Sequence, residues 1–199
     1  MRRELTTSLL AVVIFTILLG LIYPVGIWAV GQVAFPGQAD GSLTHVNGRL
    51  VGSSLIGQDF SGGARAAAYF QSRPSADRYN PAGTFFSNRG PNQASAVAFY
   101  KQQLAAYVRR EGRYDSGLTA AQVPVDAVTT SGSGVDPHIS QANALIQAHR
   151  IAAVRRLPLA RVEKLIAQHT DGRFAGFLGE PGVNVLGLNV ALDKEAPLT

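Results

Sequence analysis

A long apolar run near the start of the chain is the strongest feature of the sequence. No side chain that is charged at neutral pH occurs between Glu4 and Asp40. At about 1.5 Å rise per residue, a helix from Leu9 to Val30 is long enough to cross a hydrocarbon layer of about 30 Å. The pattern predicts a transmembrane anchor over residues 1–33, followed by one globular domain over residues 34–199.

A cleaved signal peptide is the alternative interpretation of this run. Such a peptide has a shorter apolar core, of about 7–15 residues, before a small-x-small cleavage site. The tripeptide Ala29-Val30-Gly31 fits such a site, but the uncharged stretch before it is longer than that core. An uncleaved anchor is therefore the favoured interpretation.

The charges that flank the anchor predict its orientation. Arg2 and Arg3 precede the helix, and short flanking segments with Lys or Arg stay in the cytoplasm. We expect a short cytoplasmic N-terminus, a single pass through the cell (inner) membrane and an extracytoplasmic domain. Pro24 predicts a kink near the outer end of the helix. The small or polar residues within the span are candidate contacts with partner helices: Thr16, Gly20 and Gly26.

The first half of the domain shows a hairpin pattern, a loop and a helix. Residues 43–56 alternate apolar and polar side chains around Asn47-Gly48, which favours a type I′ turn. Residues 61–93 are rich in Gly, Pro, Asn and Ser, and aromatic anchors predict an ordered loop: Tyr69, Phe70, Tyr79, Phe85 and Phe86. Residues 93–111 predict a helix that ends at Gly112 and buries one face: Val97, Tyr100, Leu104, Tyr107 and Val108.

The second half predicts two further helices between strands. Residues 123–128 predict a short strand, and residues 183–192 predict a strand followed by a helical turn. Ser140 is a candidate cap of a helix whose apolar face comprises Ala144, Leu145, Ala148, Ile151, Ala152 and Leu157. Pro158 ends that helix and opens the next one, which buries Val162, Leu165 and Ile166. Helices in the middle and strands at both ends predict an α+β domain.

Composition and charge exclude several classes of function. The chain has no Cys, which excludes disulfides, zinc sites with Cys ligands and thiol nucleophiles. Its net charge is +5, and the basic residues are spread along the whole sequence. This distribution fits a solvated surface better than a nucleic-acid-binding surface.

Candidate catalytic chemistry is confined to one loop. Ser131, Ser133, Asp136 and His138 are the residue types of a hydrolytic triad, and a membrane-anchored extracytoplasmic hydrolase is the alternative function. Turn formation explains the same residue types without catalysis, so we predict no catalytic site. The remaining histidines lack the spacing of metal ligands, and we predict no metal site: His45, His149 and His169.

The loop that begins at Tyr69 is the best candidate for a protein interface. Aromatic side chains and Arg on a stiff, proline-containing loop are typical of such interfaces. The alternative is that Tyr69 and Phe70 are core residues of an edge strand. The candidate interface residues outside the membrane are Tyr69, Phe70, Arg73, Pro74, Ser75 and Asn80.

Several segments in order resemble the C subunit of the Kdp-type potassium-transporting P-type ATPase of prokaryotes. They are the anchor ending in Tyr23-Pro24, and residues 38–43, 51–60, 69–75, 79–81, 123–140 and 178–193. Residues 85–93 lack the expected Gly-Ser-Asn-Leu run, and Gly182 stands where Arg or Val is more usual.

This resemblance implies a non-catalytic assembly and regulatory subunit of an ATP-driven potassium uptake complex. Its implied partners are a potassium-channel-like subunit, which carries potassium, and a P-type ATPase subunit, which hydrolyses ATP. It also implies a catalytic chaperone that raises the affinity of the ATPase subunit for ATP. No cofactor is expected to bind stably to this chain, and contact with ATP is expected only through the complex. An extracytoplasmic domain conflicts with direct contact, because ATP is cytoplasmic.

Overall fold

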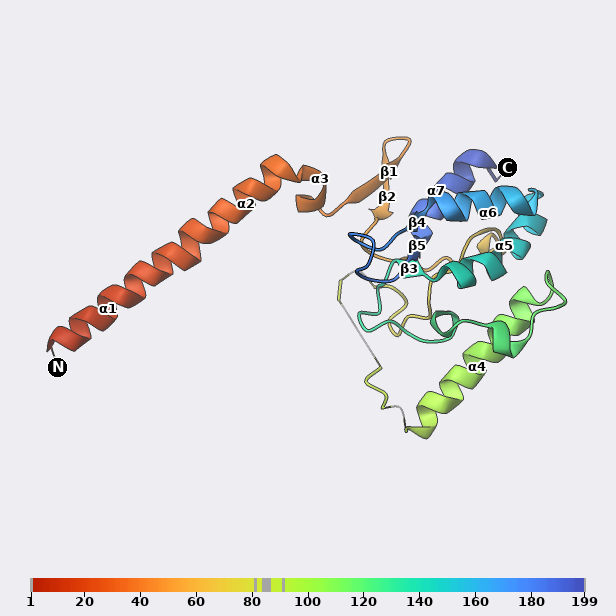
Figure 1. Cartoon of the computed structure of the whole chain (residues 1–199), viewed down its shortest axis with the longest axis horizontal. Coiled ribbons are helices and arrows are strands. Elements are labelled where there is room, and N and C mark those ends of the chain that lie inside the picture. The colour runs from red at the N-terminus through yellow and green to blue at the C-terminus, as the bar shows by residue number, and fades with distance from the viewer. Residues whose placement is uncertain (1, 81, 84–86, 91, 199) are drawn as a thin grey trace. The chain divides into compact units, whose positions relative to one another are not determined.

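The chain forms an N-terminal helical unit and an α+β domain in the computed structural model (Figure 1), which describes all residues except 1, 81, 84–86, 91 and 199. The two compact units comprise residues 1–43 and residues 44–199. The predicted boundary between residues 33 and 34 stays a prediction.

The first unit is dominated by the apolar run. The α-helix α1 (Arg2–Ile17) continues through a π-helical turn (Leu18–Ile22) into α2 (Tyr23–Ala34), and α3 (Pro36–Ala39) follows. Within the described residues, these 33 residues from Arg2 to Ala34 are the one helix long and apolar enough to cross a membrane. The π turn lies directly before Pro24, at the point where a proline ring clashes with the carbonyl four residues earlier. The wider turn accommodates the ring.

The predicted hairpin is confirmed. Strands β1 (Leu43–Val46) and β2 (Arg49–Ser53) form a two-stranded sheet. Both turn residues have positive φ, 50° at Asn47 and 78° at Gly48, as a type I′ turn requires. Asn and Gly tolerate this conformation best, so two residues determine the position of the hairpin.

The core of the domain lies between a small sheet and three helices. The sheet is antiparallel in the order β3 (His138–Ile139), β5 (Gly182–Asn184), β4 (Thr170–Asp171). Helix α6 (Leu159–Gln168) contacts both α5 (Gln141–Arg155) and α7 (Val185–Glu195), and α5 and α7 contact β5. The buried core residues are Phe70, Ile139, Ala144, Ala148, Ile151, Val162, Leu165, Ile166, Val183, Val185, Leu188 and Leu192. The α+β prediction is confirmed.

Helix α4 (Ala94–Glu111) matches its predicted bounds but not its predicted face. In Figure 1 it lies on the opposite side of α5 from α6 and α7. Val97 and Tyr100 are exposed, whereas Ala96, Tyr107 and Glu111 are buried. In α5, likewise, Leu145 is exposed although the predicted apolar face included it. The α6 face is as predicted, with its three residues buried.

One element assignment was wrong, and another was right in order but too short in its helix. Residues 123–128 contain a 3₁₀ turn (Val125–Ala127), preceded by another (Ala120–Gln122), and no strand. The turn places the Asp126 carboxylate against the N-terminus of α5, where it accepts from the Ser140 backbone N–H at 2.9 Å. The C-terminal segment forms the short strand β5 and then a complete helix, because Asn184 caps α7 by accepting from the Gly187 N–H. The predicted loop anchors Phe85 and Phe86 lie outside the described residues.

Candidate functional site

A 3₁₀ turn (Ala66–Ala68) leads into an extended segment, residues 69–71, that pairs with none of the described strands. Two amide side chains take the place of a strand neighbour. Asn189 of α7 accepts from Phe70 N–H at 2.9 Å and donates to Phe70 C=O at 3.0 Å. Gln147 of α5 accepts from Gln71 N–H at 2.7 Å and donates to Gln71 C=O at 3.1 Å. Because both backbone groups of each residue are satisfied, the segment can be buried without a sheet.

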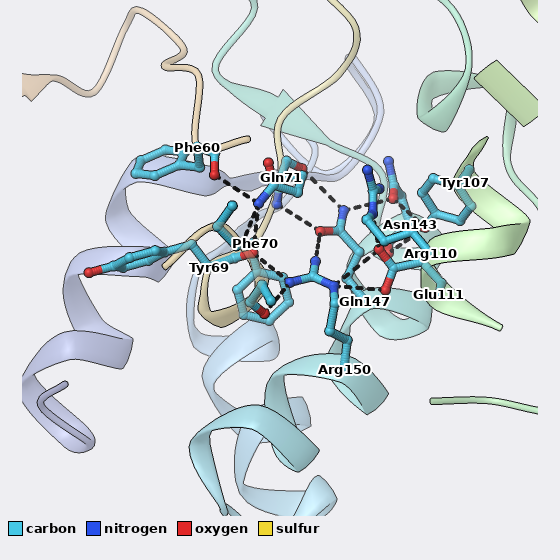
Figure 2. Close-up of polar contacts among 12 residues, drawn as sticks. Phe60, Tyr69, Phe70, Gln71, Tyr107, Arg110, Glu111, Asn143, Gln147 and Arg150 are labelled. Atoms are coloured by element: carbon cyan, nitrogen blue, oxygen red, sulfur yellow. Dashed lines mark hydrogen bonds and ion pairs between the residues drawn. The ribbon is translucent and has the colours of Figure 1, made fainter. Parts of the chain in front are cut away.

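Two arginines of α5 bind the carbonyls of residues 67–69, and Figure 2 shows one of the two, Arg150. Arg150 donates from Nη1 to Ala67 C=O at 2.6 Å and to Tyr69 C=O at 2.8 Å. Its Nε lies 3.0 Å from Oε2 of Glu111, and both side chains are almost fully buried, at 1% and 0% exposure. Arg155 donates to Ala68 C=O at 2.9 Å. Helix α5 therefore holds the segment by charge-assisted hydrogen bonds.

The hydrogen-bond network continues from the segment to α4 and the 3₁₀ turn. Tyr107 donates to Oδ1 of Asn143 at 2.8 Å, and Gln147 donates to the same oxygen at 2.9 Å. Asn143 donates to Asp126 at 2.9 Å. Burial raises the pKa of Tyr107 and lowers the pKa of Arg150. These groups have their partners within the domain, and the network positions the backbone of residues 67–71.

The first two candidate interface residues differ in burial. Phe70 is 0% exposed and belongs to the core, as the alternative interpretation held. Tyr69 is half-buried, its hydroxyl donates to Asp193 at 3.0 Å, and the Arg155 guanidinium lies 4.8 Å from its ring centroid. Only Tyr69 of this pair has surface to offer a partner.

Arg73 bonds to its own domain. It donates from Nη1 to Asp136 at 3.1 Å and from Nη2 to Thr129 Oγ1 and Thr130 C=O, both at 3.3 Å. The Tyr79 hydroxyl donates to Arg73 C=O at 2.8 Å, and burial raises the pKa of Tyr79 to about 12. Arg73 therefore links two loops of the domain: its own loop, which includes Tyr79, and the loop that precedes β3.

The remaining candidates occupy the turn after Arg73 and the anchor. Ser75 donates to Gly134 C=O at 2.7 Å and accepts from Tyr79 N–H at 3.0 Å. Pro74 is half-buried, and Asn80 is exposed and accepts from Ala82 N–H at 3.0 Å. The three anchor candidates are exposed along the described helix: Thr16, Gly20 and Gly26. Their role as partner contacts stays a prediction.

The serine and histidine loop is not arranged as a triad. Ser131 accepts from Gly134 N–H at 2.9 Å, so it stabilises its own turn. The two ring nitrogens of His138 face carboxylates, with Nε2 3.1 Å from Asp171 and Nδ1 3.7 Å from Asp136. Neither ring nitrogen is therefore directed at a serine. Among the described residues, no group of three or more His, Cys, Asp or Glu could hold a metal ion.

Gly182 allows the His138 ring to reach across the sheet. Gly182 of β5 lies opposite Asp171 of β4, and a Cβ at this position would lie 3.2 Å from Cβ of His138. The carboxylate of Asp136 raises the pKa of His138 most, and that of Asp171 adds to the effect. His138 in turn lowers the pKa of Asp136 through their hydrogen bonds. The three side chains thus form an ionic link between β3 and β4.

The fold and these side chains define a helix-anchored α+β domain whose polar interior is used for its own architecture. Residues 5–194 match the family model described as K+-transporting ATPase, c chain. The chain is 45% identical over 197 residues to the potassium-transporting ATPase KdpC subunit of Mycobacterium tuberculosis (strain ATCC 25618 / H37Rv), covering 98% of this chain and 100% of the relative. The corresponding subunit of Methylococcus capsulatus is 48% identical over 189 residues, 94% and 95% of the two chains. The chain belongs to the KdpC family of potassium-transporting ATPase subunits, and its place in that complex implies an accessory role in potassium uptake.

Proposed function

We propose that this chain is a non-catalytic assembly and regulatory subunit that raises the affinity of the ATPase subunit for ATP. The observation that carries the proposal is the full-length family match, over residues 5–194. The buried polar network supports it, because Arg150 binds Glu111 and Gln147, and Arg150 and Gln147 bind the backbone of residues 67–71. A potassium-channel-like subunit and a P-type ATPase subunit are the proposed partners.

The proposed topology requires that this effect on ATP be indirect. Arg2 and Arg3 favour a cytoplasmic N-terminus, which puts the domain outside the cell membrane. ATP is cytoplasmic, so a domain outside would act by changing the equilibrium between conformations of its partners. A reporter fused after Thr199 is expected to give an extracytoplasmic signal, and a cytoplasmic signal would reverse this topology.

The dependence of ATPase rate on ATP concentration tests the proposed function. Detergent-solubilised complex is assayed with and without this chain, at saturating potassium. Removal of the chain is expected to raise KM for ATP, and adding the purified full chain back is expected to restore it. An unchanged KM in a complex that remains assembled would overturn the regulatory role. Hydrolytic activity of the purified chain alone would instead support the alternative of an anchored hydrolase.

A further inference from the structure

The buried carboxylate of Glu111 forms ion pairs with two arginines. Arg150 Nε lies 3.0 Å from Oε2, and Arg110 Nε lies 2.6 Å from Oε1 (Figure 2). Glu111 is 0% exposed, so little water screens these charges. One carboxylate cannot neutralise two guanidinium groups, so these three side chains together carry one positive charge in excess.

Arg110 presents that excess charge to solvent. Its side chain is 43% exposed, and within the described part of the chain its two terminal nitrogens have no hydrogen-bond partner. The guanidinium lies over the Tyr107 ring, 5.2 Å from its centroid, which restricts its orientation. A planar group held by Nε and by an aromatic ring presents its remaining N–H groups in the geometry that pairs with a carboxylate.

Two adjoining cavities share Arg110. The larger, about 270 Å³, lies between α4 and residues 58–79, and the smaller, about 180 Å³, lies beside Arg113. Gln103 lines the larger one, and its side chain has no hydrogen-bond partner among the residues that the structure describes. Together the two cavities form the Arg110 cleft, which offers cationic donors and an amide along one line of α4.

The rim of the Arg110 cleft contains strained backbone. Arg78 and Tyr79 are consecutive non-glycine residues in the left-handed region, with φ of 59° and 61°. Such conformations are unfavourable for both residues and concentrate at functional sites. The turn leaves the Arg78 side chain 85% exposed, with a carboxylate of Asp59 at 3.8 Å as its nearest ionic partner among the described residues.

We propose that the Arg110 cleft binds a carboxylate-bearing peptide segment of a partner subunit, with Arg110 as the principal contact. The excess positive charge favours an anion, and the amide of Gln103 suits the backbone of a peptide. The proposal rests on the accessory role proposed above, since it requires partner subunits. Arg73, Pro74 and Ser75 also line the larger cavity, but the principal contact proposed here is Arg110 of α4, through its surplus charge.

Binding of the full chain to a detergent-solubilised complex that lacks it tests the proposal. Arg110→Gln is expected to raise Kd at least tenfold and to reduce its salt dependence. Arg109→Gln on the same helix is the matched control, because Arg109 is exposed and lines neither cavity of the cleft. Gln103→Glu adds a negative charge to the cleft without removing a Glu111 partner, and it too is expected to raise Kd tenfold. Thermal melts of each variant in detergent identify any loss of folding.

Competitors identify the class of ligand. A capped hexaglutamate peptide at 5 mM is expected to displace the wild-type chain, whereas sodium phosphate or ATP at matched ionic strength is not. Displacement by phosphate or ATP but not by the peptide would overturn the assignment to a peptide carboxylate. If Arg110→Gln and Gln103→Glu bind as tightly as the wild-type chain, the proposed role of the cleft is overturned, whereas the accessory role is not. If the wild-type chain itself fails to bind, the accessory role proposed above is overturned as well.

Discussion

Replacement of Arg150 by Met should destabilise the domain strongly. The change removes one of the two ion-pair partners of the buried Glu111 carboxylate and a donor to the part-buried carbonyls of Ala67 and Tyr69. Breaking a buried ion pair from one side costs about 3–5 kcal/mol. The lost hydrogen bonds to the carbonyls add less, because both carbonyls are part-buried and that of Tyr69 still accepts from Gln71 at 3.2 Å. These contributions overlap because one side chain makes them all. Arg110 also still pairs with Glu111, so we expect a total loss of about 3–5 kcal/mol.

Thermal unfolding of the full chain in detergent measures this loss. For a domain of this size 1 kcal/mol shifts Tm by about 2–4 °C, so Arg150→Met should lower Tm by roughly 6–20 °C. Arg109→Met is the control, because Arg109 is exposed on α4, and its Tm should stay within about 2 °C of wild type. Adding Glu111→Leu to Arg150→Met should recover part of the loss by removing the buried charge. A loss below about 1 kcal/mol for Arg150→Met would refute the account of residues 67–71.

Three further perturbations address other contacts of the domain. Asn189→Leu removes both side-chain bonds to Phe70 and should cost about 1–3 kcal/mol, measured by urea unfolding; an unchanged midpoint would contradict this. The pKa of His138 is raised in the folded state, so its protonated ring stabilises the domain below about pH 6.5. This stabilisation is lost as the pH rises through the folded-state pKa. Between pH 6 and pH 9 the wild-type Tm should therefore fall more than that of His138→Gln. The difference should correspond to less than about 1 kcal/mol, because the ion pairs of His138 are partly exposed. Equal changes of Tm with pH in the two proteins would show that the ionic link does not stabilise the domain. Arg73→Lys should lower Tm nearly as much as Arg73→Ala, since an ammonium cannot bind Asp136 and Thr130 together; full stability of the lysine variant would show that charge alone suffices.

Features determined by neighbouring residues were predictable from the sequence. Asn47-Gly48 located the hairpin because few other residue pairs tolerate two positive φ angles. Ser140 located the start of α5, where its side chain accepts from Asn143 N–H. The apolar periodicity of α6 predicted its buried face correctly. In each case the determining interaction spans a few positions along the chain.

The side chains that hold residues 67–71 escaped prediction because apolar periodicity assigns polar residues to solvent. Asn143, Gln147 and Arg150 follow one another at helical spacing on α5, and all three are buried. That spacing is the one local signal that they share a face. Nothing near them in the sequence shows that the face binds residues 67–71, or that Asn189 completes the site. The backbone groups that Gln147, Arg150 and Asn189 bind lie 76 to 119 positions away along the chain.

The distance along the chain between Phe70 and Asn189 sets an order of events during biosynthesis. The two residues are 119 positions apart, which at about 5–20 residues per second means roughly 6–24 s of translation between them. Throughout that interval the peptide groups of Phe70 have no permanent partner, while the anchor has already been synthesised. The core of the domain is therefore completed after α7 emerges from the ribosome. A nascent chain interrupted before Asn189 would carry a membrane anchor and an unfinished, aggregation-prone domain.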